Sequence, residues 1–248
     1  MINLKTPEEI ALMREAGRIA ARVLQELEQA LAVGVTTAHL DKLAEKLIRS
    51  LGGEPAFLGY QNFPASICTS INNEVVHGIP GLRRLQEGDI ISIDVGVRFK
   101  GYYGDAAATF GVGAISAEAR RLIQVTRASL ERGIQAMQVG GYLSDISHAV
   151  QSFVEEHNFS VVRQYVGHGI GSQMHEEPQV PNFGRPGRGP LLQPGIALAI
   201  EPMVNAGHYE VKVLEDRWTV VTKDGSLSAH FEHTVALGEE GPEILTVL

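Results

Sequence analysis

Hydrophobic positions recur along this chain with two different periods, and each period predicts a different kind of element. Apolar residues three and four positions apart predict helices over about residues 7–31, 35–51, 116–137 and 144–157. Thr6, Pro7 and Glu9 are residue types typical of a capped helix start, so the first helix is expected to begin there. Short apolar runs bounded by turn residues predict strands near residues 65–70, 89–97, 103–110, 160–166, 196–201, 210–222 and 231–237.

The two halves of the chain share a faint repeat. Leu85–Asp94 resembles Leu192–Glu201 at an offset of 107 residues, and a Val-Gly pair precedes a helix at 33–34 and at 139–140. This shared order predicts two similar halves, each with two helices and a small sheet. It also predicts that Asp94 and Glu201 occupy equivalent strand ends, which would bring one carboxylate from each half to a central site. Since no linker or low-complexity tract interrupts the chain, we expect a single domain over 1–248.

Composition narrows the classes of protein that fit. Apolar residues make up 44% and charged residues 20%, as is usual for soluble globular proteins. A net charge of −8 and a pI near 5.6 argue against nucleic acid as the main partner. The single cysteine, Cys68, excludes an intramolecular disulfide and fits a reducing compartment. The chain start lacks the apolar core of a signal peptide, and no apolar run approaches the roughly 20 residues of a membrane span, so we expect a cytoplasmic protein.

Two aspartates interrupt runs that otherwise read as buried strands. Asp94 and Asp105 flank a predicted hairpin tip and are symmetric about the midpoint of Phe99 and Lys100. A turn centred there would place the two residues opposite each other, with Cβ atoms about 4.5–5.5 Å apart. A turn centred on Lys100 and Gly101 would break that pairing. Two buried carboxylates at such a distance need a proton or a cation between them, and a divalent metal would meet that need.

Three further residues extend this candidate metal site. Glu201 ends the apolar run 196–200, Glu232 lies in another predicted strand, and His168 stands between two glycines. Four carboxylates and one imidazole suit Mn, Fe(II), Co or Zn, and the number of carboxylates indicates two ions. An isolated acidic residue would more often face solvent, as we expect for Asp89. The absence of HExxH and CxxC motifs argues against a zincin or a structural zinc cluster.

The remaining histidines fall into three groups. His77 and His175 lie in polar, loop-like segments, where a histidine near a metal can position a substrate or move a proton; simple exposure is the alternative. His233 should point to the opposite face of its strand from Glu232. The glycine- and proline-rich segment 182–190 is predicted to be a loop. The other histidines have no comparable context and are expected to be structural or exposed, namely His39, His148, His157, His208 and His230.

Seven stretches together resemble the type I methionine aminopeptidases over essentially the whole chain. The resemblance implies the pita-bread fold, an α/β (α+β) architecture with pseudo-two-fold related halves and a central antiparallel sheet flanked by helices. It further implies the short form of the family, without an N-terminal zinc-binding extension and without the helical insertion of type II members. The stretches are Cys68–Pro80, Ile93–Val95, Gly104–Asp105, Gly167–Gly171, Met174–Pro181, Ile200–Met203 and Phe231–Thr234.

The resemblance also implies roles for individual residues. Asp94 would bind one metal ion, His168 and Glu201 would bind the other, and Asp105 and Glu232 would bridge the two. Glu201 would in addition act as general base or proton shuttle.

Two loop histidines and an apolar pocket complete the implied site. His77 would form a hydrogen bond near the scissile amide, and His175 would bind the carbonyl oxygen. Without the resemblance, ordinary core packing would account for the aromatic residues of the pocket. The family pattern often has an aromatic residue where this chain has Met174 and a smaller one where it has Phe57, which could reshape the pocket. The implied pocket residues are Tyr60, Phe63, Cys68 and Trp218, with Phe57 and Met174 nearby.

The implied activity is removal of the initiator methionine from nascent proteins by metal-activated water, with a small second residue preferred. The implied partners are the N-termini of nascent polypeptides and, transiently, the ribosome, while nothing demands more than a monomer. A Xaa-Pro aminopeptidase or dipeptidase of the same fold is the alternative, although such enzymes usually carry a separate N-terminal domain. A non-catalytic binding protein or a metal-free amidinohydrolase on this fold is disfavoured by the complete set of ligand positions.

Overall fold

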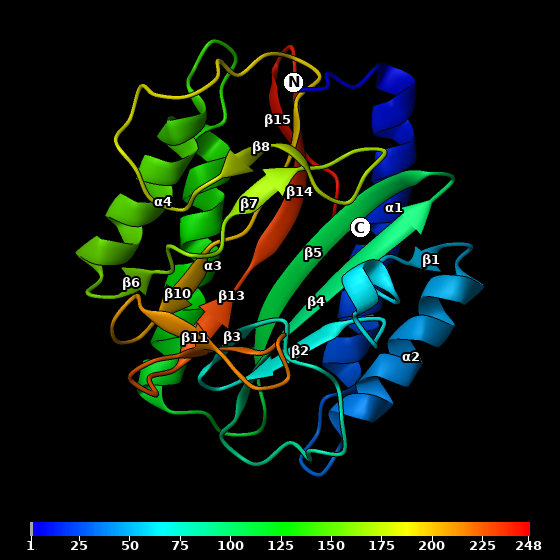
Figure 1. Ribbon diagram of the computed structural model, residues 1–248, viewed down its shortest axis with the longest axis vertical. Helices are drawn as coiled ribbons and strands as arrows, with labels where there is room; N and C mark the ends of the chain where they lie inside the picture. Colours follow the sequence, from blue (N-terminus) through cyan, green and yellow to red (C-terminus); the bar gives the residue numbers. More distant parts are fainter. Residues whose placement is uncertain (1) are drawn as a thin grey trace.

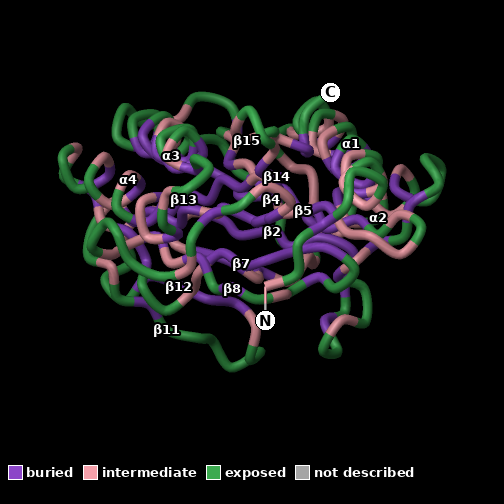
Figure 2. Tube along the Cα trace, turned by 90° about the horizontal axis from the view of Figure 1, so that it is seen from above, coloured by how far each residue is buried: buried purple, intermediate pink, exposed green. Residues whose placement is uncertain are grey.

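A long antiparallel sheet, covered on one face by two pairs of helices, forms the framework of the protein in the computed structural model, which describes residues 2–248 (Figure 1, Figure 2). All four predicted helices are confirmed to within about two residues. The capping box at the first helix is confirmed as well, since the Thr6 hydroxyl accepts a hydrogen bond from the Glu9 amide and the Glu9 carboxylate accepts one from the Thr6 amide. The helices are α1 (Pro7–Ala30), α2 (Thr37–Ser50), α3 (Ala117–Ala136) and α4 (Leu143–Glu156), with a short 3₁₀ helix η1 (Tyr60–Asn62).

The strands are more numerous than the sequence predicts, and two of the predicted runs are divided or shortened. The predicted strand 210–222 is two strands, because residues 214–217 turn back on themselves, with the Arg217 amide donating to the Leu214 carbonyl. The predicted strand 160–166 is reduced to two residues. The strands are β1 (Glu54–Pro55), β2 (Cys68–Ile71), β3 (Glu74–Val76), β4 (Ile90–Phe99), β5 (Tyr102–Gly111), β6 (Ser160–Val161), β7 (Gly167–Gly169), β8 (Glu176–Val180), β9 (Ala197–Ile200), β10 (Met203–Asn205), β11 (Val211–Val213), β12 (Val220–Thr222), β13 (Ser228–His230), β14 (Glu232–Gly238) and β15 (Gly241–Ile244).

The main sheet runs in the order β1-β4-β5-β14-β9-β7-β8, and alternate residues of its strands face opposite ways. Along β4 the apolar side chains pack against α1 and α2, whereas Asp94 between them points to the other face. The helix-facing residues of β4 are Ile91, Ile93, Val95 and Val97. Figure 2 shows the helices lying together on one side of the sheet. The opposite face is therefore left free to carry polar residues.

The β4–β5 hairpin corrects one prediction from the sequence. Phe99 pairs with Tyr102, so the turn is centred on Lys100 and Gly101, and Asp94 lies opposite Ala107. Both turn residues have positive φ, 47° at Lys100 and 90° at Gly101, which is the backbone that two-residue hairpin turns require. The expected direct pairing of Asp94 with Asp105 is therefore wrong, and the two lie diagonally.

The internal repeat predicted from the sequence is present in the structure. The Gly34 amide donates to the Leu85 carbonyl at 2.8 Å, and the Gly140 amide donates to the Leu192 carbonyl at 2.9 Å. Each half thus ties the loop between its two helices to the segment that leads into a strand of the main sheet. One detail differs, since Asp94 lies within β4 whereas Glu201 directly follows β9. None of the helices within residues 2–248 has the length and apolarity needed to cross a membrane.

Candidate metal centre and its pocket

Five neighbouring strands of the main sheet each bring one candidate ligand to the face that the helices leave free. The ligands come from widely separated parts of the sequence, and the sheet order places them side by side. In sheet order they are Asp94 on β4, Asp105 on β5, Glu232 at the start of β14, Glu201 just after β9 and His168 on β7.

Strand register explains why these side chains share a face. Ala107 of β5 lies opposite Asp94 on one side and opposite Glu232 on the other. Residues directly opposite each other point the same way, and so do residues two apart on one strand. Asp105, two residues from Ala107, therefore joins the same row.

Strand pairing places His168 and Glu201 on this face in the other half of the sheet. Ala199 of β9 lies opposite both His168 and Thr234, and Glu201 is two residues further along. The Thr234 hydroxyl also fixes the backbone of Asp105, accepting from its amide and donating to its carbonyl, both at 2.9 Å. The candidate ligands are thus held by strand pairing rather than by flexible loops.

His168 presents one nitrogen to the carboxylates. Its Nε2 lies 3.6 Å from Glu201 Oε1 and 3.9 Å from Asp105 Oδ2. Its Nδ1 lies 2.9 Å from the Gly169 carbonyl oxygen, which can only accept, so Nδ1 carries the proton. Nε2 therefore has a free lone pair directed at the acidic cluster, as a metal ligand needs.

Burial makes the ionised forms of the four carboxyl groups energetically unfavourable. Burial, together with the neighbouring carboxylates, raises the pKa of Asp94, Glu201 and Glu232 well above the ordinary range. Burial also raises the pKa of Asp105 to about 7 and lowers the pKa of His168 to about 3. Without a bound cation, some of these carboxylates would have to be protonated at neutral pH.

Three carboxylate oxygens supply an independent indication of a cation. Asp94 Oδ1, Asp105 Oδ1 and Glu232 Oε1 are buried and have no hydrogen-bond donor among residues 2–248. Buried polar atoms normally have a partner. Carboxylate oxygens with one imidazole form a donor set that divalent Mn, Fe, Co and Zn accept. The residues present therefore fit a divalent metal, although their individual roles as ligands stay predictions.

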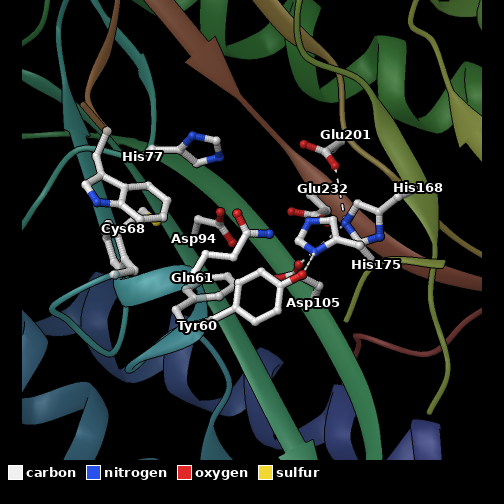
Figure 3. Close-up of a pocket in the computed structure, with 13 residues that line it drawn as sticks. Tyr60, Gln61, Cys68, His77, Asp94, Asp105, His168, His175, Glu201 and Glu232 are labelled. Atoms are coloured by element: carbon white, nitrogen blue, oxygen red, sulfur yellow. Dashed lines mark hydrogen bonds and ion pairs between the residues drawn. The ribbon is translucent and has the colours of Figure 1, made fainter. Parts of the chain in front are cut away.

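A cavity of about 200 Å³ opens next to this cluster (Figure 3). Met174 packs behind its wall, against the apolar cluster that includes Phe57 and Cys68. Cys68 lies opposite Asp94 in the β2–β4 pairing, and burial raises the pKa of its thiol well above the ordinary value. The structure thus brings every residue predicted for the substrate pocket to one cavity, lined by Phe57, Tyr60, Phe63, Cys68, His77, His175 and Trp218 together with the five candidate ligands.

The two loop histidines stand on opposite sides of the cavity in Figure 3, with Asp94 between them. His175 Nδ1 lies 2.8 Å from the Tyr60 hydroxyl. The His77 ring packs edge-on with Trp218 and with Tyr165, and its centroid lies 6.3 Å and 5.5 Å from theirs, respectively. The backbone of His77 has a φ of 60°. Burial, followed by the charge of the nearby His175, lowers the pKa of His77 to about 4, so this imidazole is neutral at pH 7.

His230, expected to be structural or exposed, is buried beside the acidic cluster. Its side chain is 2% exposed, and its Nε2 lies 3.6 Å from Glu201 Oε2 and 3.9 Å from Glu232 Oε2. Its position two residues before Glu232 in an extended segment was the available signal. The prediction for His233 is confirmed, because its Nδ1 lies 2.8 Å from the Thr246 hydroxyl in a groove lined by α1 and α3.

Asp89 and Gln61 differ from what the sequence predicts. Asp89, expected to face solvent, is only 9% exposed and accepts hydrogen bonds from the Asn72 side chain and the Gln86 amide. Gln61, for which the sequence predicted no role, lines the cavity and has a φ of 48°. Segment 182–190 is a loop, as predicted.

A buried ion pair also escaped the sequence. Lys5 Nζ lies 2.6 Å from Glu176 Oε2, and the two side chains are each 5% exposed. Lys5 additionally donates to the Asn3 carbonyl at 2.8 Å, and its backbone amide donates to the Gly195 carbonyl. Glu176 directly follows His175, so the N-terminal segment is anchored against the loop that carries this pocket histidine.

The fold and the site together are those of a metallopeptidase. The profile described as metallopeptidase family M24 matches residues 11–239, and the chain belongs to that family. The chain is 57% identical to the methionine aminopeptidase of Clostridium acetobutylicum, covering 100% of this chain and 99% of the relative. It is 54% identical to methionine aminopeptidase 1 of Bacillus subtilis, covering 99% of each.

Solved structures agree with these relatives. The crystal structure of methionine aminopeptidase from Thermotoga maritima matches with a TM-score of 0.99 and 46% identity over 100% of both chains. The Xaa-Pro dipeptidase of Bacillus anthracis matches with a TM-score of 0.78 at 22% identity, over 98% of this chain and 61% of that one, which shows a shared fold alone. The expected pita-bread fold and the resemblance to methionine aminopeptidases are confirmed.

Proposed function

We propose that this protein removes the N-terminal methionine from polypeptides in a reaction that depends on divalent metal ions. The observation that carries the proposal is the cavity of about 200 Å³ that joins an acidic cluster to an apolar, aromatic slot. Full-length relatives at 54–57% identity bear the name methionine aminopeptidase, which supports the same activity. No feature of the described residues favours cleavage at Xaa-Pro bonds.

The acidic cluster would hold two divalent ions, which we propose to be Co, Mn, Fe(II) or Zn. Asp94, Asp105, His168, Glu201 and Glu232 would supply the donor atoms. Bound ions of this kind lower the pKa of water toward about 7 and polarise a carbonyl group. Two ions would also offset the mutual repulsion of four carboxylates, which a single dication would do only in part.

His175 and Glu201 would handle the charge and the protons of the reaction. If the Tyr60 hydroxyl donates to His175 Nδ1 across their 2.8 Å contact, the proton of the neutral imidazole resides on Nε2. His175 then donates from Nε2 to the substrate carbonyl oxygen and stabilises the negative charge that develops there. Glu201, whose pKa is raised by burial, accepts a proton from the attacking water and passes it to the leaving amine. His77 lies across the cavity, where its neutral imidazole forms a hydrogen bond with the scissile amide.

The apolar part of the cavity would select the side chain. Phe57, Phe63 and Trp218 supply aromatic walls, and Cys68 supplies a sulfur. A flexible thioether makes favourable contacts with both kinds of group. The acidic end of the cavity is complementary to a free α-amine, which favours cleavage at the chain terminus. We propose nascent polypeptides with a small second residue as the substrates.

Cleavage of a small peptide panel tests this proposal. The metal-loaded protein would be incubated with Met-Ala-Ser, Leu-Ala-Ser, Met-Trp-Ser and Ala-Pro-Ser, and the released amino acids would be quantified. We expect release from Met-Ala-Ser to exceed release from each of the others by about 10- to 200-fold, the range over which an apolar pocket distinguishes similar side chains. Preferred cleavage of Ala-Pro-Ser would contradict the assignment of the pocket. No release from any peptide would favour a non-catalytic role.

A further inference from the structure

We propose that His230 is an additional ligand of the metal centre, which then contains two imidazoles. The inference rests on the metal dependence proposed above and specifies the donor set of that site. His230 is the last residue of β13, outside the main sheet, and lies two residues before Glu232, the first residue of β14.

The two imidazoles are placed equivalently about Glu201. His168 Nε2 lies 3.6 Å from Glu201 Oε1, and His230 Nε2 lies 3.6 Å from Glu201 Oε2. His230 Nε2 is also 3.9 Å from Glu232 Oε2. Oxygen and nitrogen donors about 2.1 Å from a tetrahedral ion are separated from each other by about 3.4 Å. Separations of 3.6–3.9 Å therefore suit donors around a common cation, whereas a hydrogen bond between them would be shorter than about 3.2 Å.

The backbone of His230 is held in place, and the Nε2 of its buried imidazole has no hydrogen-bonding partner. The residue is 2% exposed, and its Nε2 forms no hydrogen bond with any group among residues 2–248. The Thr109 hydroxyl holds its backbone at both ends, accepting from the amide at 2.9 Å and donating to the carbonyl at 2.8 Å. A buried nitrogen that is aimed at two carboxylates and left unpaired is the arrangement a metal ligand requires.

A second imidazole would change the metal preference of the site. Carboxylate donors suit Mn, whereas imidazole suits Zn, Fe and related ions of the later transition series. Glu201, His230 and Glu232 form a group of three possible donors within 4.8 Å of one another, beside the group formed by Asp105, His168 and Glu232. Each of two ions would then have an imidazole within reach.

Counting the imidazoles that bind cobalt tests the proposal directly. Protein with isotopically labelled histidine would be saturated with Co(II), and the strongly shifted imidazole N–H protons would be observed by NMR. Two such signals are expected from the wild type. His230→Gln should lose one of them, His168→Gln should lose the other, and His233→Gln, a histidine on the opposite face of the same segment, should retain both.

The wild-type spectrum alone can overturn the proposal, even if a variant fails to fold. A single shifted imidazole at saturating Co(II), or two signals that persist in His230→Gln, would show that His230 is not a ligand. The absence of Co(II) uptake would overturn the metal centre itself. Because binding is observed without substrate, Co(II) uptake with two signals and no methionine release would refute the proposed activity and leave this inference standing.

The affinities for two metals provide a second measurement. By competition with a chelator, we expect His230→Gln to weaken Co(II) binding by at least about tenfold and Mn(II) binding by less. His233→Gln should change neither affinity by more than about twofold. Equal losses for Co(II) and Mn(II), or no loss for either, would contradict an imidazole ligand at this position.

Discussion

Removing the positive charge of Lys5 should destabilise the protein far more than a change so close to the chain start would ordinarily do. Lys5 Nζ and Glu176 Oε2 are 2.6 Å apart, and both side chains are 5% exposed. In Lys5→Met the Glu176 carboxylate stays buried and loses its partner. It keeps only the hydrogen bond from the Gln173 amide, at 3.1 Å.

The expected magnitude follows from this geometry. Two unit charges 2.6 Å apart attract each other by about 6 kcal/mol at an effective dielectric constant of about 20. Loss of one partner from a buried pair typically costs about 3–5 kcal/mol. For a chain of this size that corresponds to a fall in Tm of about 6–20 °C. Detachment of the N-terminal segment would let water reach Glu176 and would limit the loss to the lower end of the range.

Urea unfolding of four proteins would measure the effect. Arg14→Met is the matched control, because it breaks an ion pair of similar length, 2.7 Å to Glu243, whose side chains are 33% and 47% exposed. That control should cost no more than about 1 kcal/mol. The double variant Lys5→Met/Glu176→Gln should recover about half or more of the loss, since it removes the unpaired charge.

Two results would contradict the role assigned to the buried Lys5–Glu176 pair. The first is a loss of stability in Lys5→Met no larger than in Arg14→Met. The second is a double variant that is less stable than Lys5→Met, because it would show that the unpaired Glu176 charge is not the source of the cost.

Three further predictions concern pH, the pocket and the metal. Burial, followed by the Arg127 charge, lowers the pKa of His233 to about 4. As the pH falls from about 6.5 to 4, the unfolded chain therefore takes up a proton at this histidine before the folded protein does. Over this window the wild type should lose up to about 3 kcal/mol more stability than His233→Gln does. Unfolding curves at pH 7 and pH 4.5 check this, and equal pH dependence of the two proteins would refute it. In Gly96→Ala the added Cβ would lie 2.6 Å from Phe57 Cε1, so the Phe57 ring should move into the cavity and raise the KM for Met-Ala-Ser severalfold. Gly81→Ala is the control, because the atom nearest to its added Cβ is 4.0 Å away and its KM should not change. Steady-state kinetics of the two variants check this prediction. Mn(II) at a hundred times its Kd should raise the unfolding free energy of the wild type by about 2.7 kcal/mol, and a similar rise in Asp105→Asn would contradict its role as a ligand.

The sequence predicted the elements whose signals are local. The helix that begins at Pro7 was readable from its cap and its period, because both depend on residues within a few positions of one another. The five candidate ligands were readable because each charged or imidazole group lies within, or at the end of, an apolar run or between glycines. The structure brings them to one pocket.

The features that were missed depend on spatial neighbours. The register of the β4–β5 hairpin depends on whether Lys100 adopts a positive φ. A shift of the turn by one residue changes which residue lies opposite Asp94. His230 lies in a strand of only three residues, too short to show a period. Lys5 and Glu176 are 171 residues apart, and nothing in either local sequence indicates the other. Asp89 was assigned to the surface because its two hydrogen-bonding partners become apparent only in the folded chain.

The metal dependence of the proposed reaction can be measured as methionine release from Met-Ala-Ser by metal-depleted protein to which Mn(II), Co(II) or Fe(II) is added back, with Glu201→Ala measured in parallel. We expect no release before metal is added, release of free methionine that rises with bound metal, and less than about 1% of that rate in folded Glu201→Ala. Methionine release that is unchanged by a chelator, or that persists at the wild-type rate in Glu201→Ala, would contradict a metal-dependent reaction at this cluster.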